Sequence, residues 1–162
     1  MKVRLAKYCD LEAILSIYEK ARIFMRSMGN LTQWGNTYPS VEIIRTDIEN
    51  ENLFVVVDDL NTIQAVFALI LGEDPSYQAI DGAWLSDDAY ATLHRVASSG
   101  AQKGVFNACI EFAWSVCSNL RIDTHENNKL MRHLIEKHKF VYCGIITVED
   151  GSPRHAYQKV EI

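Results

Sequence analysis

Apolar residues recur at helical spacing in the first part of the chain. After Asp10, a polar residue able to cap a helix, apolar side chains follow every three or four positions as far as Phe24. Gly29 predicts the end of this helix. Ser40 predicts the cap of a second helix that runs to about residue 50, and residues 31–40 predict a polar and aromatic loop between the two helices.

Short β-branched runs alternate with turn residues through most of the remaining chain. The runs Leu53–Val57 and Ile63–Leu71 predict a hairpin, and residues 72–88 predict an irregular insert. This order of elements predicts an α/β (α+β) fold with a mixed sheet, and we expect residues 1–162 to form a single domain because no linker or repeat divides them. Further strands are predicted at residues 3–5, 91–97, 120–124, 140–148 and 155–160, and a further helix at residues 128–137.

Residues 93–114 are the most informative stretch. A β-rich run leads into a Ser- and Gly-containing loop at residues 98–104, and an apolar helix of about four turns follows Gly104. A small-residue loop that opens into a helix directs unpaired backbone N–H groups and the positive end of the helix dipole at one point, which favours a phosphate site. A plain strand-to-helix turn is the alternative interpretation.

Composition narrows the class of protein. The net charge of −5 argues against a nucleic-acid partner, because proteins that bind nucleic acids usually carry a basic face. No run of apolar residues is long enough to predict a membrane span, and the N-terminal residues lack the apolar segment of a signal peptide, so we expect a cytoplasmic protein without a membrane partner. No two of the four cysteines have C-x-x-C spacing, so we expect no metal site.

The order of elements, together with two motifs, resembles the GNAT superfamily of acetyl-CoA-dependent N-acetyltransferases. The cofactor motif of that family is Val, four residues, and then [Arg/Gln]-x-x-Gly-x-[Gly/Ala], and it falls on Val96 and residues 101–106. A later motif, Asn-x-x-Ala-x-x-Leu-Tyr followed by Gly-Phe, falls on residues 128–135 and 139–140. The resemblance covers nearly the whole chain, and it implies a mostly antiparallel central sheet of six to seven strands with helices on both faces.

The resemblance implies acetyl-CoA as the acyl donor and a set of donor-binding residues. Ala101 replaces the usual Arg or Gln, Phe106 replaces the Gly or Ala that permits a close approach of the pyrophosphate, and Ile135 replaces the Tyr that often protonates the departing thiolate. The side chain of Phe106 must therefore point elsewhere or narrow the site. The implied donor-binding residues are Val96, Ala97, Ala101, Gln102, Lys103, Gly104, Val105, Phe106 and Asn128.

Acetyl transfer to an amine needs a proton acceptor, and His94 is the first candidate for a general base. A structural histidine beside Arg95 is the alternative. Regular strand alternation predicts that His94 and Val96 share one face and that Arg95 and Ala97 share the other. Tyr142 could supply a phenol in place of the missing acid, although a packing role is the alternative.

Three aromatic residues in the irregular loops, Trp34, Tyr38 and Trp84, could line an acceptor pocket, or could instead anchor those loops to the core. We therefore expect an N-acetyltransferase that moves an acetyl or other acyl group to a primary amine of a small molecule or peptide. Attack would be direct, because no cysteine occupies a motif position. The alternative is a catalytically inactive GNAT-like module that binds CoA or another ligand. The resemblance also leaves a homodimer open.

Overall fold

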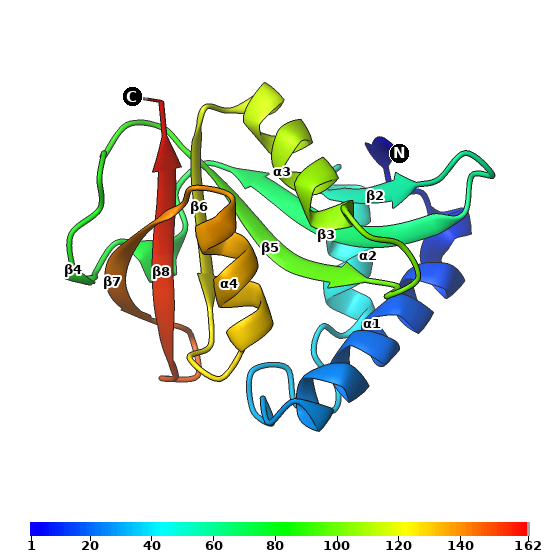
Figure 1. Ribbon diagram of the computed structural model, residues 1–162, viewed down its shortest axis with the longest axis horizontal. Coiled ribbons are helices and arrows are strands. Elements are labelled where there is room, and N and C mark those ends of the chain that lie inside the picture. The colour runs from blue at the N-terminus through cyan, green and yellow to red at the C-terminus, as the bar shows by residue number, and fades with distance from the viewer. Residues whose placement is uncertain (162) are drawn as a thin grey trace.

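The fold is built on one mixed sheet, which Figure 1 shows in a computed structural model that describes residues 1–161. The strand order is β1-β2-β3-β5-β6-β8-β7-β4, and every neighbouring pair is antiparallel except β5 and β6. The sheet therefore has eight strands, rather than the six to seven expected, and the short β4 lies in the stretch predicted to be irregular. The strands are β1 (Lys2–Leu5), β2 (Leu53–Val57), β3 (Ile63–Leu71), β4 (Asp81–Gly82), β5 (Ala91–Ser98), β6 (Asn119–Thr124), β7 (Val141–Thr147) and β8 (Pro153–Val160).

Helices cover both faces of the sheet. In Figure 1, α3 and α4 lie in front of the sheet and α2 lies behind it. One buried cluster joins α3 and α4 to the sheet, and a second joins α1 and α2 to the opposite face. The helices are α1 (Leu11–Ser27), α2 (Val41–Glu49), α3 (Val105–Val116) and α4 (Lys129–Lys137), with short 3-10 turns η1 (Tyr8–Asp10) and η2 (Pro75–Tyr77). Thus α3 has twelve residues, a little shorter than predicted.

A side chain defines the start of α2 as the sequence predicts, and the start of α1 differs from the prediction. The Oγ of Ser40 accepts a hydrogen bond from the backbone N–H of Ile43 at the start of α2. Asp10 directly precedes α1, but its carboxylate does not cap that helix. It instead pairs with the guanidinium of Arg4, at 2.8 Å, and accepts the N–H of Lys7. Asp10 therefore fastens β1 to the entry of α1.

The sheet opens between its two parallel strands. β5 and β6 are in register only at Ala91 with Leu120 and at Thr92 with Arg121. Beyond these pairs the strands continue toward Ser98 and Thr124 without further pairing. The two strands therefore diverge at their carboxyl ends, and this divergence leaves room for a site in the middle of the sheet.

The regular alternation of side chains expected for β5 is wrong, because the strand contains a β-bulge. Ala68 pairs with His94 and Val66 with Ala97, so Arg95 and Val96 together oppose the single residue Phe67. Arg95 has a left-handed φ of 52°. Val96 consequently packs against the core beneath α3 and α4, whereas Ala97 lies in the core beneath α1 and α2. His94 and Val96 thus do not share a face, as regular alternation predicted.

Among residues 1–161, no helix combines the length and the apolar character that a membrane crossing requires.

Candidate functional site

Two cavities meet at the bulge of β5. A groove of about 700 Å³ lies between α1, the end of β5, the start of α3 and α4. A cleft of about 560 Å³ lies where β5 and β6 diverge, and the α1–α2 loop and the β7–β8 turn close it. Val96, Asn128, Met25 and Met131 line both cavities. A molecule in the groove can therefore reach a second molecule in the cleft beside Val96.

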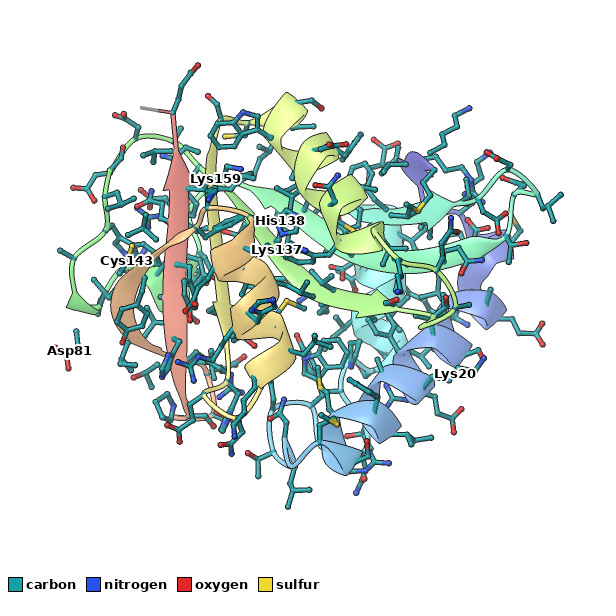
Figure 2. All side chains as sticks on the ribbon, viewed as in Figure 1. Lys20, Asp81, Lys137, His138, Cys143 and Lys159 are labelled. Carbon is teal, nitrogen blue, oxygen red and sulfur yellow. The ribbon has the colours of Figure 1, made fainter. Side chains whose placement is uncertain are left out.

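The groove includes the start of α3, which is the expected phosphate site. Gly104 precedes this helix with a left-handed φ of 81° and has no side chain that could cap the first turn. The N-terminus of α3 thus presents its dipole and its first N–H groups beside the groove. Figure 2 labels cationic side chains on the elements that border it, Lys20 on α1 and Lys137 on α4, and both line the groove.

The expected donor-binding residues divide into two groups. Val96, Ala97, Gly104, Val105, Phe106 and Asn128 line the groove, whereas Ala101, Gln102 and Lys103 are exposed in the preceding loop and do not line it. The hydroxyls of Ser98 and Ser99 accept hydrogen bonds from the N–H groups of Gly100 and Ala101, so the loop folds on itself.

Phe106 lines the groove, but most of its ring is buried in the core. Its side chain is 6% exposed and belongs to the core beneath α3 and α4. The ring meets the ring of His138 edge to face, with 5.1 Å between centroids. The bulky side chain therefore points largely into the interior. Ile135, which replaces the usual acid, is fully buried in the same core.

In the cleft, His94 is paired with a carboxylate. Its Nε2 lies 2.7 Å from Oδ2 of Asp74, and both residues line the cleft. Oδ1 of Asp74 accepts the N–H of Ser76, and the backbone N–H of Asp74 donates to the hydroxyl of Tyr90. Burial acts to raise the pKa of Asp74, but the hydrogen bond and charge of His94 outweigh it and hold that pKa below its ordinary value. An ionised Asp74 therefore fixes the orientation of the imidazole.

A second network holds the bulge itself. The guanidinium of Arg95 makes two hydrogen bonds to Asp47 on α2, of 2.8 and 2.9 Å, and a third to the hydroxyl of Tyr38, at 3.2 Å. The hydroxyl of Tyr18 on α1 donates to the carbonyl oxygen of Arg95 at 2.8 Å. Sequence reasoning missed Asp47 and Tyr18. A carboxylate within the apolar pattern of α2 was the available signal for Asp47, since a buried charge needs a partner.

The α1–α2 loop is tied to the far side of the cleft. The side-chain oxygen of Gln33 accepts hydrogen bonds from the amides of Asn30, at 2.8 Å, and Asn128, at 3.3 Å. The Oδ1 of Asn128 also caps α4 through the N–H of Met131. Asn128 therefore connects the loop with the start of α4, at the point where the two cavities join.

Two of the three aromatic loop residues line the cleft. Trp34 is buried against the ring of Tyr18, and Tyr38 lies beside Trp34. Trp84, which we predicted with them, lies elsewhere. Its ring covers Tyr77 and the guanidinium of Arg121, and its Nε1 donates to the carbonyl of Tyr77, so it anchors its own loop.

The proposed acid Tyr142 is also outside both cavities. It is half exposed on β7 and packs against Tyr157 and His155 of β8. Since β8 stands between β7 and β6, the Tyr142 phenol does not reach the gap between β5 and β6. The position of Tyr142 favours the packing role that was the alternative to a catalytic one.

The charged residues that line the cleft are predominantly acidic. They are Asp74, Asp123, Glu149 and Asp150, beside Arg95, Arg154 and His94. Since Asp47 neutralises Arg95, the walls favour a cationic group. Within residues 1–161, no three His, Cys, Asp or Glu side chains are grouped so that they could hold a metal ion.

Comparison with known proteins agrees with the geometry. No protein-family model and no curated protein matches the chain. A GNAT-family acetyltransferase from Streptococcus agalactiae is 31% identical, with a TM-score of 0.90 over 99% of this chain and 95% of that one.

Two more distant structures share the fold. A GNAT-family acetyltransferase from Listeria monocytogenes is 20% identical, with a TM-score of 0.72 over 98% of this chain and 93% of the other. A phosphinothricin acetyltransferase from Sinorhizobium meliloti, solved in complex with AcCoA, is 14% identical, with a TM-score of 0.66 over 98% of this chain and 86% of the other. The identity to the streptococcal protein over nearly the whole of both chains establishes that this chain belongs to the GNAT family of acetyltransferases.

Proposed function

We propose that this chain is an N-acetyltransferase that moves an acetyl or other acyl group from acyl-CoA to a primary amine by direct attack. The observation that carries the proposal is the meeting of two cavities at Val96. One is an extended groove that ends at a helix N-terminus, and the other is an acidic cleft that holds a carboxylate-bound histidine. Two separate substrate sites that share one wall suit a transfer between two bound molecules.

The groove suits the CoA part of the donor. Its apolar walls, which include Phe24 and Leu134, fit the uncharged arm of the molecule. The start of α3 behind Gly104 and the ammonium groups of Lys20 and Lys137 fit the phosphates. This assignment brings the thioester end of the donor toward Val96 and the cleft.

In the transfer, the amine nitrogen bonds to the thioester carbonyl carbon while the carbon–sulfur bond breaks. The acyl group becomes an amide, and CoA leaves with the electron pair of that bond. An acceptor that arrives as an ammonium ion releases two protons, of which one ends on the CoA sulfur and the other passes to solvent. Because a thiolate is a good leaving group, the reaction tolerates Ile135 in place of an acid.

His94 takes the proton that makes the acceptor amine nucleophilic. Its Nε2 lies 2.7 Å from Oδ2 of Asp74, and the Asp74 carboxylate stabilises the imidazolium that forms when His94 accepts the proton. The acidic walls of the cleft attract the ammonium form of the acceptor before the proton is removed. The proposed catalytic residue is thus His94, with Asp74 as its positioning partner.

The test is release of free CoA thiol when the protein is incubated with acetyl-CoA and a broad panel of primary amines. We expect turnover with at least one class of amine, and a His94→Gln variant should lose roughly a hundredfold or more in kcat. His133→Gln is the matched control, because His133 is exposed on α4 and lines neither cavity.

Thiol release from no amine would count against the proposal. If calorimetry then showed acetyl-CoA binding without turnover, the inactive binding module would be the better description. Full activity of His94→Gln would remove His94 from the mechanism while leaving the transfer in place.

A further inference from the structure

Arg154, at the start of β8, is a buried cation in the acceptor cleft. Its side chain is among the buried polar ones, with the residue 5% exposed, and it lines the cleft. Its Nη1 donates to the carbonyl oxygen of the preceding Pro153, at 3.0 Å. Within residues 1–161 no carboxylate lies within 4.0 Å of its guanidinium.

The other buried or half-buried arginines near the cleft all have strong partners. Arg95 has the two oxygens of Asp47. Arg121 is held between the rings of Trp84 and Tyr90, each with its centroid 3.9 Å from the guanidinium carbon. A buried guanidinium without an anion or an aromatic partner is costly. Arg154 therefore differs from its neighbours in a way that internal packing does not explain.

Arg154 lines the cleft, and none of its nitrogens is both sealed from solvent and without a hydrogen-bond partner. Nε of Arg121, by contrast, is sealed in the interior without a hydrogen-bond partner. The positive charge of Arg154 also acts on a neighbouring residue. Burial is the largest cause that lowers the pKa of His125, and the charge of Arg154 is the next. Asp123, Glu149 and Asp150 line the same cleft, but none forms an ion pair with Arg154.

The position of Arg154 is complementary to that of His94. His94 projects from β5, and Arg154 comes from β8, which lies beyond β6 on the other side of the gap. A molecule that fills the cleft therefore meets a base at one wall and a fixed guanidinium at the other.

We propose that Arg154 binds a carboxylate of the acceptor, so that the acceptor class is the free amino acids. The inference rests on the proposed N-acetyltransferase function. A guanidinium and a carboxylate form a pair of charge-assisted hydrogen bonds. The acidic cleft walls favour a zwitterion with a single negative charge over a doubly charged phosphate, and Trp34 and Tyr38 offer an apolar surface to the side chain.

The test compares acceptors that differ only in the carboxylate. A panel of proteinogenic L-amino acids, the matching α-carboxamides and O-phosphoethanolamine would be assayed with acetyl-CoA by thiol release. We expect at least one amino acid to exceed its amide by about tenfold or more in kcat/KM. The difference in amine basicity works against the expected result. The amine of an amino-acid amide is less basic than that of the amino acid, so a larger fraction of it is the nucleophilic free base.

Variants then tie the preference to Arg154. Arg154→Gln and Arg154→Met should raise KM for the preferred amino acid about tenfold or more and leave its amide nearly unchanged. Arg45→Gln, at an exposed position of α2 outside the cleft, is the matched control. Equal use of amino acids and amides by the wild-type protein would overturn the inference, as would a preference for O-phosphoethanolamine or an unchanged preference in folded Arg154 variants.

Failure of the inference can be told apart from failure of the proposed function. Turnover of simple amines without any preference for a carboxylate overturns the inference alone. If no acceptor is turned over, calorimetry with the same amino acids and amides in the presence of CoA tests whether the carboxylate site exists. Binding of amino acids over amides, lost in Arg154→Gln, supports the carboxylate site without the enzyme, and binding of neither overturns it.

Discussion

The hydroxyl of Tyr18 on α1 donates a 2.8 Å hydrogen bond to the carbonyl oxygen of Arg95, the residue that forms the bulge of β5. Tyr18 is fully buried, and burial raises its pKa well above the ordinary value, so the phenol stays a donor. The bond links the helix that borders both cavities to the strand segment where they meet. The shape of the bulge therefore depends on a residue outside the strand.

Replacement of Tyr18 by Phe keeps the ring and removes this donor. We expect a loss of about 1–3 kcal/mol in the free energy of unfolding, because the carbonyl of Arg95 is left without its partner. We also expect kcat for acyl transfer to fall more than the KM for acetyl-CoA rises, since the change acts on the position of Val96. Denaturant unfolding and steady-state kinetics measure the two effects.

Tyr8→Phe is the matched control for Tyr18→Phe. Tyr8 is half exposed and donates to the exposed carboxylate of Glu49, a contact that water can replace. We expect a change in stability within about 0.5 kcal/mol and unchanged kinetics. Equal effects of the two substitutions would show that the bond to Arg95 does not position the bulge.

Asp47→Asn tests the second attachment of the bulge. Asp47 is buried and holds the guanidinium of Arg95 through both of its oxygens. Loss of its charge leaves Arg95 poorly compensated in the interior, and we expect a destabilisation of roughly 3 kcal/mol. Asp59→Asn, at an exposed turn, should be nearly neutral, and thermal unfolding of both variants measures the contrast. If Asp47→Asn left the stability unchanged, the bulge would keep Arg95 in place without the charge of the Asp47 carboxylate.

The sequence predicted the fold well because most of its elements have strong local signals. The apolar spacing of α1, the hairpin of β2 and β3, and the Gly104 loop before α3 each depend on residues close together in the chain. The short β4 has no such signal. It forms because Gly82 and Gly144, which are far apart in sequence, permit two backbones to approach closely.

The site was less predictable because it depends on distant contacts and on one inserted residue. The bulge at Arg95 reverses the direction of every later side chain in β5, and no local pattern in residues 91–98 marks it. The pairing of His94 with Asp74 joins residues from β5 and the irregular insert. Trp84 and Tyr142 lie outside both cavities, and the sequence did not indicate this because an aromatic residue in a loop or strand does not reveal which way its ring faces.

The ion pair of Asp10 predicts a specific pH dependence of stability. The hydrogen bond from Arg4 lowers the pKa of Asp10 below the ordinary 3.8, against the opposing effect of burial. Because the folded pKa lies below the unfolded one, the pair stabilises the fold fully above pH 3.8, and this contribution is lost as the pH falls through the folded pKa. The stability difference between wild type and Asp10→Asn should therefore be constant near neutrality and shrink in acid. A difference independent of pH would contradict this.

Phe106→Ala tests whether the bulky residue in the donor motif obstructs the groove. Since the ring is buried in the core and packs on His138, its removal should cost about 3–5 kcal/mol of stability by leaving a cavity. Acetyl-CoA affinity, measured by calorimetry on the folded variant, should not improve. A marked gain in affinity would show that the ring does narrow the donor site.

Gly144→Ala tests the close approach of β4 and β7. Gly144 has a φ of 145°, and a Cβ at this position would lie 2.1 Å from the carbonyl oxygen of Asp81, so the backbone of β4 would have to move. We expect a loss of at least about 3 kcal/mol, from strain and from a broken strand pair. Gly72→Ala is the control, because Gly72 also has a positive φ, of 100°, but open space around it, and strain alone should cost about 1–2 kcal/mol. Equal losses in chemical denaturation would mean that conformational strain, and not the approach of the two strands, requires glycine at position 144.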